Sequence, residues 1–114
     1  SRDFYWIINI NYTLPQWKNR HLANQSLKKR WDNYLKRLIK HEDTHRDIFL
    51  EGAKAIHDYI ENIPPYPLGK KDKNCLKYVS KVKDKILFIF KTYERKNLAF
   101  DLKTKFGLNN RLLL

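Results

Sequence analysis

Only one cysteine occurs in the chain, so Cys75 has no partner for an internal disulfide. A lone cysteine also excludes a structural zinc site built from cysteine pairs. No apolar run approaches the roughly 18 residues that a transmembrane helix needs, so none is expected. The chain begins with Ser1 rather than Met and carries no visible signal peptide, as would a fragment trimmed at its N-terminus.

Acidic residues are also scarce: 12 stand against 24 Lys and Arg, which gives a formal charge of +12. Such a balance favours contact with anionic surfaces such as nucleic acid, anionic lipid or acidic wall polymers, or else reflects a Lys/Asn/Ile-rich source composition. At 114 residues, the length predicts a single domain, 1–114, with a modest core.

The N-terminal region is aromatic and β-branched without helical spacing. Residues 4–10 spell Phe-Tyr-Trp-Ile-Ile-Asn-Ile, and polar and apolar residues then alternate as far as Leu14. This composition predicts a strand that Pro15 closes. Trp17 is the expected anchor of the connector that follows.

A long amphipathic helix is predicted over residues 26–62, with Asn24 or Ser26 as its cap. It would measure about 55 Å, so we expect one very long helix or two helices nearly in phase. Gly52 weakens a helix, which predicts close approach of another backbone there. The residues of its apolar stripe are mostly three or four positions apart in sequence. They are Leu27, Trp31, Tyr34, Leu35, Leu38, His45, Phe49, Gly52, Ile56 and Ile60.

Three prolines and a glycine between residues 64 and 69 predict a loop, which three lysines make basic. A second helix follows, with Asn74 as a possible cap and residues 96–114 as a tail. Its stripe is Cys75, Val79, Val82, Ile86, Ile89 and Tyr93. The expected fold class is therefore α+β but α-rich, with an N-terminal strand, a long helix and a second helix packed across it.

The most specific chemical signal is His41-Glu42-x-x-His45, the HExxH pattern of zinc hydrolases. On a helix the two histidines share one face, one turn apart, so both imidazoles can reach one Zn²⁺. Glu42 would then accept a proton from a metal-bound water as that water attacks a carbonyl. The competing interpretation is a solvated, charged helix surface, but His45 lies within the apolar stripe and needs a partner.

The motif leaves the third metal ligand open. Glu51 follows His45 by six residues, but no turn breaks the helix between them, so it falls on a different face. His57 and Asp58 are also out of phase, and His21 would have to fold back from the connector. Asp101, expected in the tail and free of helical constraint, is the best remaining candidate.

The chain resembles the bacterial predicted secreted zinc-dependent proteases, long grouped as a domain of unknown function. The likeness covers most of residues 5–110, and its distinctive parts are the HExxH and Leu14-Pro15-x-Trp17. The remaining matches are Leu27, Trp31, Ala53, Ile56, Cys75, and Phe100-Asp101-x-x-Thr104-x-Phe106-Gly107.

This resemblance implies a gluzincin-type active-site helix and a secreted or periplasmic location. Relatives typically end in Tyr-Asp-x-x-Thr-x-His-Gly, so Phe100 and Phe106 replace a Tyr and a His. If that His is the family's third ligand, this chain either has an incomplete site or uses Asp101. If that Tyr stabilises the transition state, catalysis here is weaker. An earlier cysteine that could pair with Cys75 in relatives is absent.

These observations together predict a zinc-dependent metallopeptidase with His41 and His45 as ligands, Glu42 as general base, and a protein or peptide substrate. The alternative is a catalytically impaired basic module that binds an anionic polymer, either nucleic acid or cell envelope. Nucleic acid is the weaker partner, because Trp31 lies on the apolar stripe and Trp6 on the predicted strand. Attachment of the Lys-rich second helix to an anionic surface is a third hypothesis.

Overall fold

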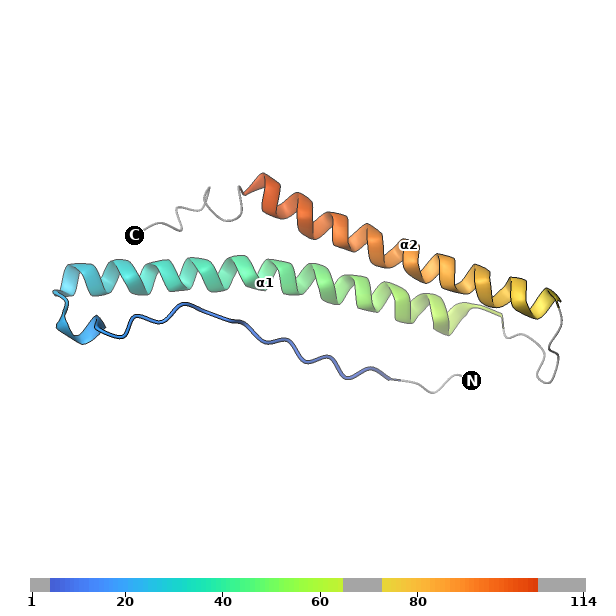
Figure 1. Ribbon diagram of the computed structural model, residues 1–114, viewed down its shortest axis with the longest axis horizontal. Coiled ribbons are helices and arrows are strands. Elements are labelled where there is room, and N and C mark those ends of the chain that lie inside the picture. The colour runs from blue at the N-terminus through green and yellow to red at the C-terminus, as the bar shows by residue number, and fades with distance from the viewer. Residues whose placement is uncertain (1–4, 65–72, 105–114) are drawn as a thin grey trace.

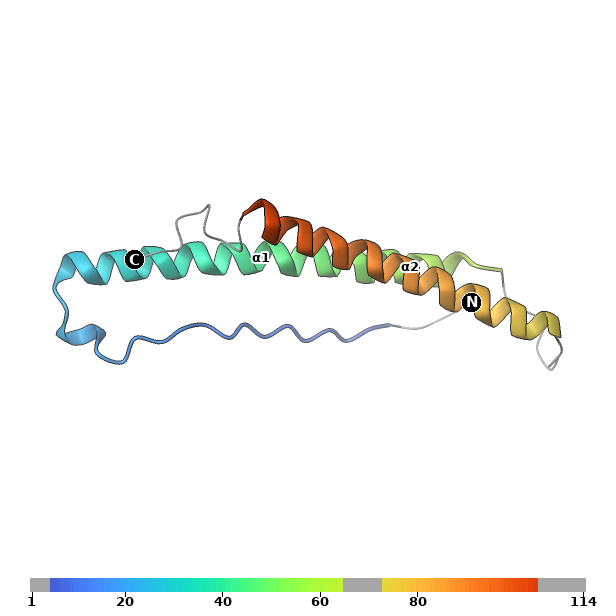
Figure 2. The same ribbon diagram turned by 45° about the horizontal axis from the view of Figure 1, so that its top comes forward.

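All regular structure in the computed structural model, which describes residues 5–64 and 73–104, is helical (Figure 1). A short 3-10 helix, η1, spans Arg20–Leu22, and two long helices follow, α1 over Gln25–Asn62 and α2 over Lys73–Lys103. The second helix runs back along the first, and the extended residues 5–17 lie alongside α1 in both views (Figure 2). The molecule is thus an antiparallel helical hairpin flanked by an extended segment.

The predicted long helix is confirmed as one uninterrupted element of 38 residues. Asn24 caps it, because its side-chain oxygen accepts a hydrogen bond from the Leu27 amide at 2.8 Å. At the other end the Ile63 amide donates to the Tyr59 carbonyl at 3.1 Å, just before Pro64. A proline cannot continue the helix, so the chain leaves α1 there.

The predicted N-terminal strand over residues 4–10 is wrong, and so is the α+β class. In the described part of this segment, residues 5–16 are extended but exchange no backbone hydrogen bond with any described residue. Aromatic and β-branched residues favour a strand only where a neighbouring strand completes the ladder, and here the neighbours are helices. A side chain attaches the segment instead, since the Tyr12 hydroxyl donates to Asp43 of α1 at 2.7 Å.

The core is a thin seam between the two helices. Ile56 is the one apolar side chain among the described residues with less than a tenth of its surface exposed. The radius of gyration is 21.4 Å, against about 13 Å for a compact domain of this length. None of the described helices is both long and apolar enough to cross a membrane. The single-domain organisation of 1–114 stays a prediction.

The predicted apolar stripe of α2 is largely confirmed. Its half-buried members are Cys75, Val82, Ile86, Ile89 and Tyr93, whereas Val79 is exposed. The helix does not stop where the tail was expected. It continues to Lys103, and the same face carries Asn97, Phe100, Asp101 and Thr104 at helical spacing.

Candidate metal centre

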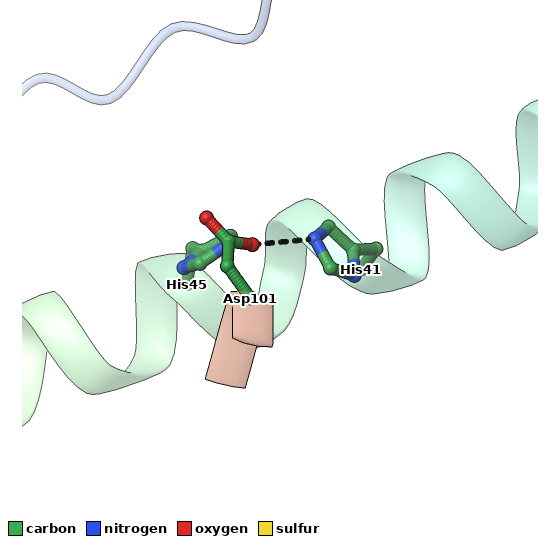
Figure 3. Close-up of side chains that lie close together, drawn as sticks. All are labelled: His41, His45 and Asp101. Atoms are coloured by element: carbon green, nitrogen blue, oxygen red, sulfur yellow. Dashed lines mark hydrogen bonds and ion pairs between the residues drawn. The ribbon is translucent and has the colours of Figure 1, made fainter. Parts of the chain in front are cut away.

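His41 and His45 project from one face of α1, and both Nε2 atoms point toward the same place (Figure 3). Their rings meet edge to face with centroids 5.0 Å apart. The His41 side chain is only 5% exposed and that of His45 21%, so the histidine outside the predicted apolar stripe is the more buried of the two. The surface interpretation of this motif therefore fails for both residues.

Asp101 comes from the last turn of α2 and meets both histidines (Figure 3). Its Oδ1 atom lies 3.1 Å from His41 Nε2 and 2.6 Å from His45 Nε2. The expectation that this residue lies in a tail free of helical constraint is wrong, because α2 itself carries the carboxylate to the site. Thr104 follows that helix, and its amide and its hydroxyl both donate to the Phe100 carbonyl, at 3.0 and 2.8 Å.

Two further side chains of α2 hold the imidazoles in place. The Phe100 ring lies 4.6 Å from His41 and 5.0 Å from His45, measured between centroids. The Oδ1 atom of Asn97 lies 2.8 Å from His45 Nδ1, so that nitrogen donates to it. This hydrogen bond fixes the ring so that Nε2 faces Asp101, a common arrangement behind histidine ligands of metals.

The arrangement raises the pKa of His45. Burial alone would lower it, but hydrogen bonds to Asn97 and Asp101, together with the negative charges of Asp101 and Glu42, outweigh that effect. When His45 is neutral, its single ring proton is on Nδ1, which donates it in the hydrogen bond to Asn97. The lone pair on Nε2 then faces the Asp101 carboxylate. The site therefore favours a cation at this point, either a second proton on the ring or a metal ion.

The three ligand atoms suit a metal ion in type and in spacing. All lie within 4.8 Å of one another, and two imidazoles with one carboxylate are a donor set of catalytic zinc. Zinc bonds of about 2.0–2.2 Å at tetrahedral angles separate ligand atoms by about 3.3 Å. The His45–Asp101 distance of 2.6 Å is shorter, so the two side chains must separate slightly to admit the ion. The Nδ1 atom of His41 is buried and has no hydrogen-bond partner among the described residues, which departs from the usual pattern behind a ligand.

Glu42 lies beside this group, half-buried, and forms no hydrogen bond or ion pair with any described residue. It lines a cleft of about 430 Å³ between α1 and the extended segment. His45 and Asn97 line the same cleft, opposite residues 8–12. Glu42 thus lines an open cleft that it shares with His45, one of the three candidate ligands.

The other ligand candidates lie elsewhere. His21 is exposed in η1, and Glu51 is exposed on α1. Asp58 pairs with Lys54 at 2.7 Å, while His57 lies 3.8 Å from Glu61. Phe106 falls outside the described residues, so its role in place of the relatives' histidine stays a prediction.

Sequence reasoning missed Asn97 as a partner of the site. The signal was present, because Asn97 and Asp101 have the same four-residue spacing as His41 and His45. Two such pairs on facing helices can meet side chain to side chain. The signal became visible only once α2 was known to extend past Tyr93.

Comparison with known proteins agrees with the resemblance at the level of the family. The family model described as "Bacterial protein of unknown function (DUF922)" matches residues 3–107. No curated protein and no solved structure matches the chain. The family description assigns no activity, so the zinc-protease interpretation stays a prediction. Because the match extends over almost the whole chain, this protein belongs to that bacterial family of unknown function.

Proposed function

We propose that this protein is a zinc-dependent hydrolase that cleaves peptide bonds. One observation carries the proposal: His41, His45 and Asp101, brought together from two helices, place three ligand atoms within 4.8 Å of one another. Exposed carboxylates often cluster without a ligand, but here the group includes a histidine only 5% exposed. Buried polar groups need partners, and one ion bound by all three side chains would serve each of them at the same time.

In this proposal the two histidines and Asp101 hold the ion and Glu42 moves the proton. A zinc ion supplies Lewis acidity and brings the pKa of a coordinated water near neutrality. The Glu42 carboxylate, which has no partner among the described residues, accepts the proton of the attacking water and delivers it to the departing amine. The cleft beside it gives a peptide access to the group from the side of residues 8–12.

Phe100 limits the catalytic rate that we expect from this site. Its ring packs on both imidazoles, and it brings no hydroxyl to the position where relatives carry a tyrosine. Any stabilisation of developing negative charge must then come from the ion and from other donors. We therefore expect slow turnover rather than no turnover. We also propose, from the resemblance alone, that the protein acts outside the cytoplasm.

The aromatic residues favour this hydrolase over a nucleic-acid module. Trp17 and Trp31 pack edge to face with centroids 5.6 Å apart, and Tyr34 lies 5.4 Å from Trp31. Rings that contact one another offer less free surface for stacking on bases.

The decisive experiment combines metal analysis with peptide cleavage. The purified full chain, prepared without chelator, should hold about one zinc, and His41→Ala or His45→Ala should lose it. His57→Ala is the matched control, because this histidine of α1 lies outside the group. Glu42→Gln should keep the zinc and lower cleavage of a denatured protein substrate by about 10²–10⁴-fold. Glu51→Gln, at an exposed position outside the group, should keep the zinc and leave cleavage unchanged. Absence of zinc uptake on titration would refute the proposal.

A further inference from the structure

A second cleft, of about 420 Å³, reaches the metal group at His41 rather than at His45. Its charged lining is entirely basic, with Arg37 and Lys40 from α1 and Lys103 from α2. Thr44, Phe100 and Thr104 complete the wall. The cleft therefore combines positive charge, hydroxyl groups and one aromatic surface directly next to a candidate ligand.

Arg37 is the most informative residue of this cleft. It is half-buried, and its Nε atom is buried with no hydrogen-bond partner in the part of the chain that the structure describes. Neither Arg37 nor Lys40 forms an ion pair within the described part of the chain. A buried guanidinium nitrogen without an acceptor is unfavourable, and two cations three residues apart on a helix repel each other. An anion in the cleft would offset the repulsion between the two charges and accept hydrogen bonds from the terminal nitrogens of the guanidinium.

The geometry of the hydrogen-bond donors in this cleft indicates which kind of anion would bind there. The planar guanidinium matches a carboxylate with two parallel hydrogen bonds, and Lys40 adds a point charge beside it. Arg37 precedes His41 by one helical turn, a rise of about 6 Å. An extended peptide covers that distance with about two residues. A carboxylate held by Arg37 would thus belong to a residue near the bond presented to the metal group.

We propose, on the basis of the proposed function, that this cleft is a subsite for a carboxylate of the peptide substrate. The carboxylate is either the C-terminus of the peptide or an acidic side chain close to the cleaved bond. The enzyme would then select acidic or C-terminal segments rather than cut any exposed chain. A run of phosphates fits less well, because the basic residues of this cleft line one concave site instead of forming an extended stripe.

The test measures binding in the metal-free full chain, so its result does not depend on zinc or on hydrolysis. The probes are N-acetyl-trialanine with a free carboxylate, the same peptide as its C-terminal amide, and N-acetyl-Ala-Glu-Ala amide. Dissociation constants come from chemical shifts of ¹⁵N-labelled protein. At least one of the two acids should bind about tenfold or more tightly than the neutral amide. The acid that does so identifies the source of the carboxylate.

Arg37→Gln should remove the preference for the acid, and Arg37→Lys should retain only part of it. Arg30→Gln is the matched control, because Arg30 is an exposed arginine of the same helix. Circular dichroism confirms that each variant is folded. Equal binding of acid and amide, or an acid preference that survives in folded Arg37→Gln and Arg37→Lys, overturns the proposal. Binding of oligothymidylate or anionic vesicles that needs Arg37, with no preference for acidic peptides, also overturns it.

Discussion

Tyr93 packs directly against Gly52 where the two long helices approach each other. A Cβ atom added at Gly52 would lie 2.9 Å from both Cβ and Cγ of Tyr93. The close approach predicted at this glycine is thus to a side chain of α2. The Cβ atom of Tyr93 is fixed to its backbone, so rotation of the side chain cannot relieve the clash.

Gly52→Ala should therefore destabilise the protein although alanine is the better helix former. The gain in helix propensity is at most about 1 kcal/mol, while overpacking costs about 1–3 kcal/mol. We expect a net loss of about 1 kcal/mol in the free energy of unfolding, measured in urea. Glu51→Ala, at the exposed neighbouring position, should leave it nearly unchanged. A more stable Gly52→Ala variant would show that the helices can separate freely.

Asn97→Ala should weaken zinc binding without removing a ligand. The Nδ1 atom of His45 loses its acceptor, and loss of such a partner typically costs 10–100-fold in metal affinity. Asn97→Asp keeps an oxygen at that position and should restore most of the affinity. Leu98→Ala is the control on the exposed side of the same helix. Unchanged zinc affinity in Asn97→Ala, measured by competition with a chromogenic chelator, would contradict this role.

Zinc affinity should fall as the pH is lowered. The fall should begin at a higher pH than it would at a site whose histidines have ordinary pKa values. The metal needs neutral imidazoles, and the pKa of His45 is raised above its usual 6.5. Below that pKa, binding must displace the proton, so the apparent affinity should drop by about tenfold per pH unit for this group. Above that pKa the contribution of His45 should level off. An affinity that stays constant down to pH 6 would show that His45 is not a ligand.

Removal of zinc should lower the melting temperature, because the candidate ligands come from both helices. Free zinc at 100 times its dissociation constant stabilises the folded state by about 2.7 kcal/mol. EDTA should abolish this gain in the wild-type chain. Asp101→Ala should melt at the same temperature with or without zinc, whereas His57→Ala should respond as the wild type does. Equal responses in the two variants would place the zinc elsewhere.

Local signals in the sequence were sufficient for α1. The cap at Asn24, the helical spacing and Pro64 all act within a few residues of the element that they define. The strand failed for the opposite reason, since Trp6 and Ile8 have strand-forming side chains but the ladder depends on a partner that no local pattern reveals. A strand packed on the core would bury both side chains, but each remains more than a third exposed.

The part of the candidate site on α1 could be predicted from its motif, whereas the residue on α2 was reached only by eliminating other candidates. HExxH brings its histidines together through the geometry of a single helix. Asp101 was a candidate only on the assumption that residues 96–114 form a tail free of helical constraint. In the fold, Asn97 lies within α2, and its side chain accepts a hydrogen bond from His45. The burial of His41 also depends on α2, which supplies the Phe100 ring above it.

The position of the three candidate ligands within the hairpin has a topological consequence. They lie where α2 ends, beside the middle of α1, and His41 and Asp101 are 60 residues apart in sequence. A bond across a segment of that length removes about 4 kcal/mol of chain entropy from the unfolded state when the link is covalent. A chain with one cysteine cannot make that link through sulfur. A metal ion at this end would therefore act as a reversible crosslink, and the thin seam between the helices would depend on the local supply of that metal.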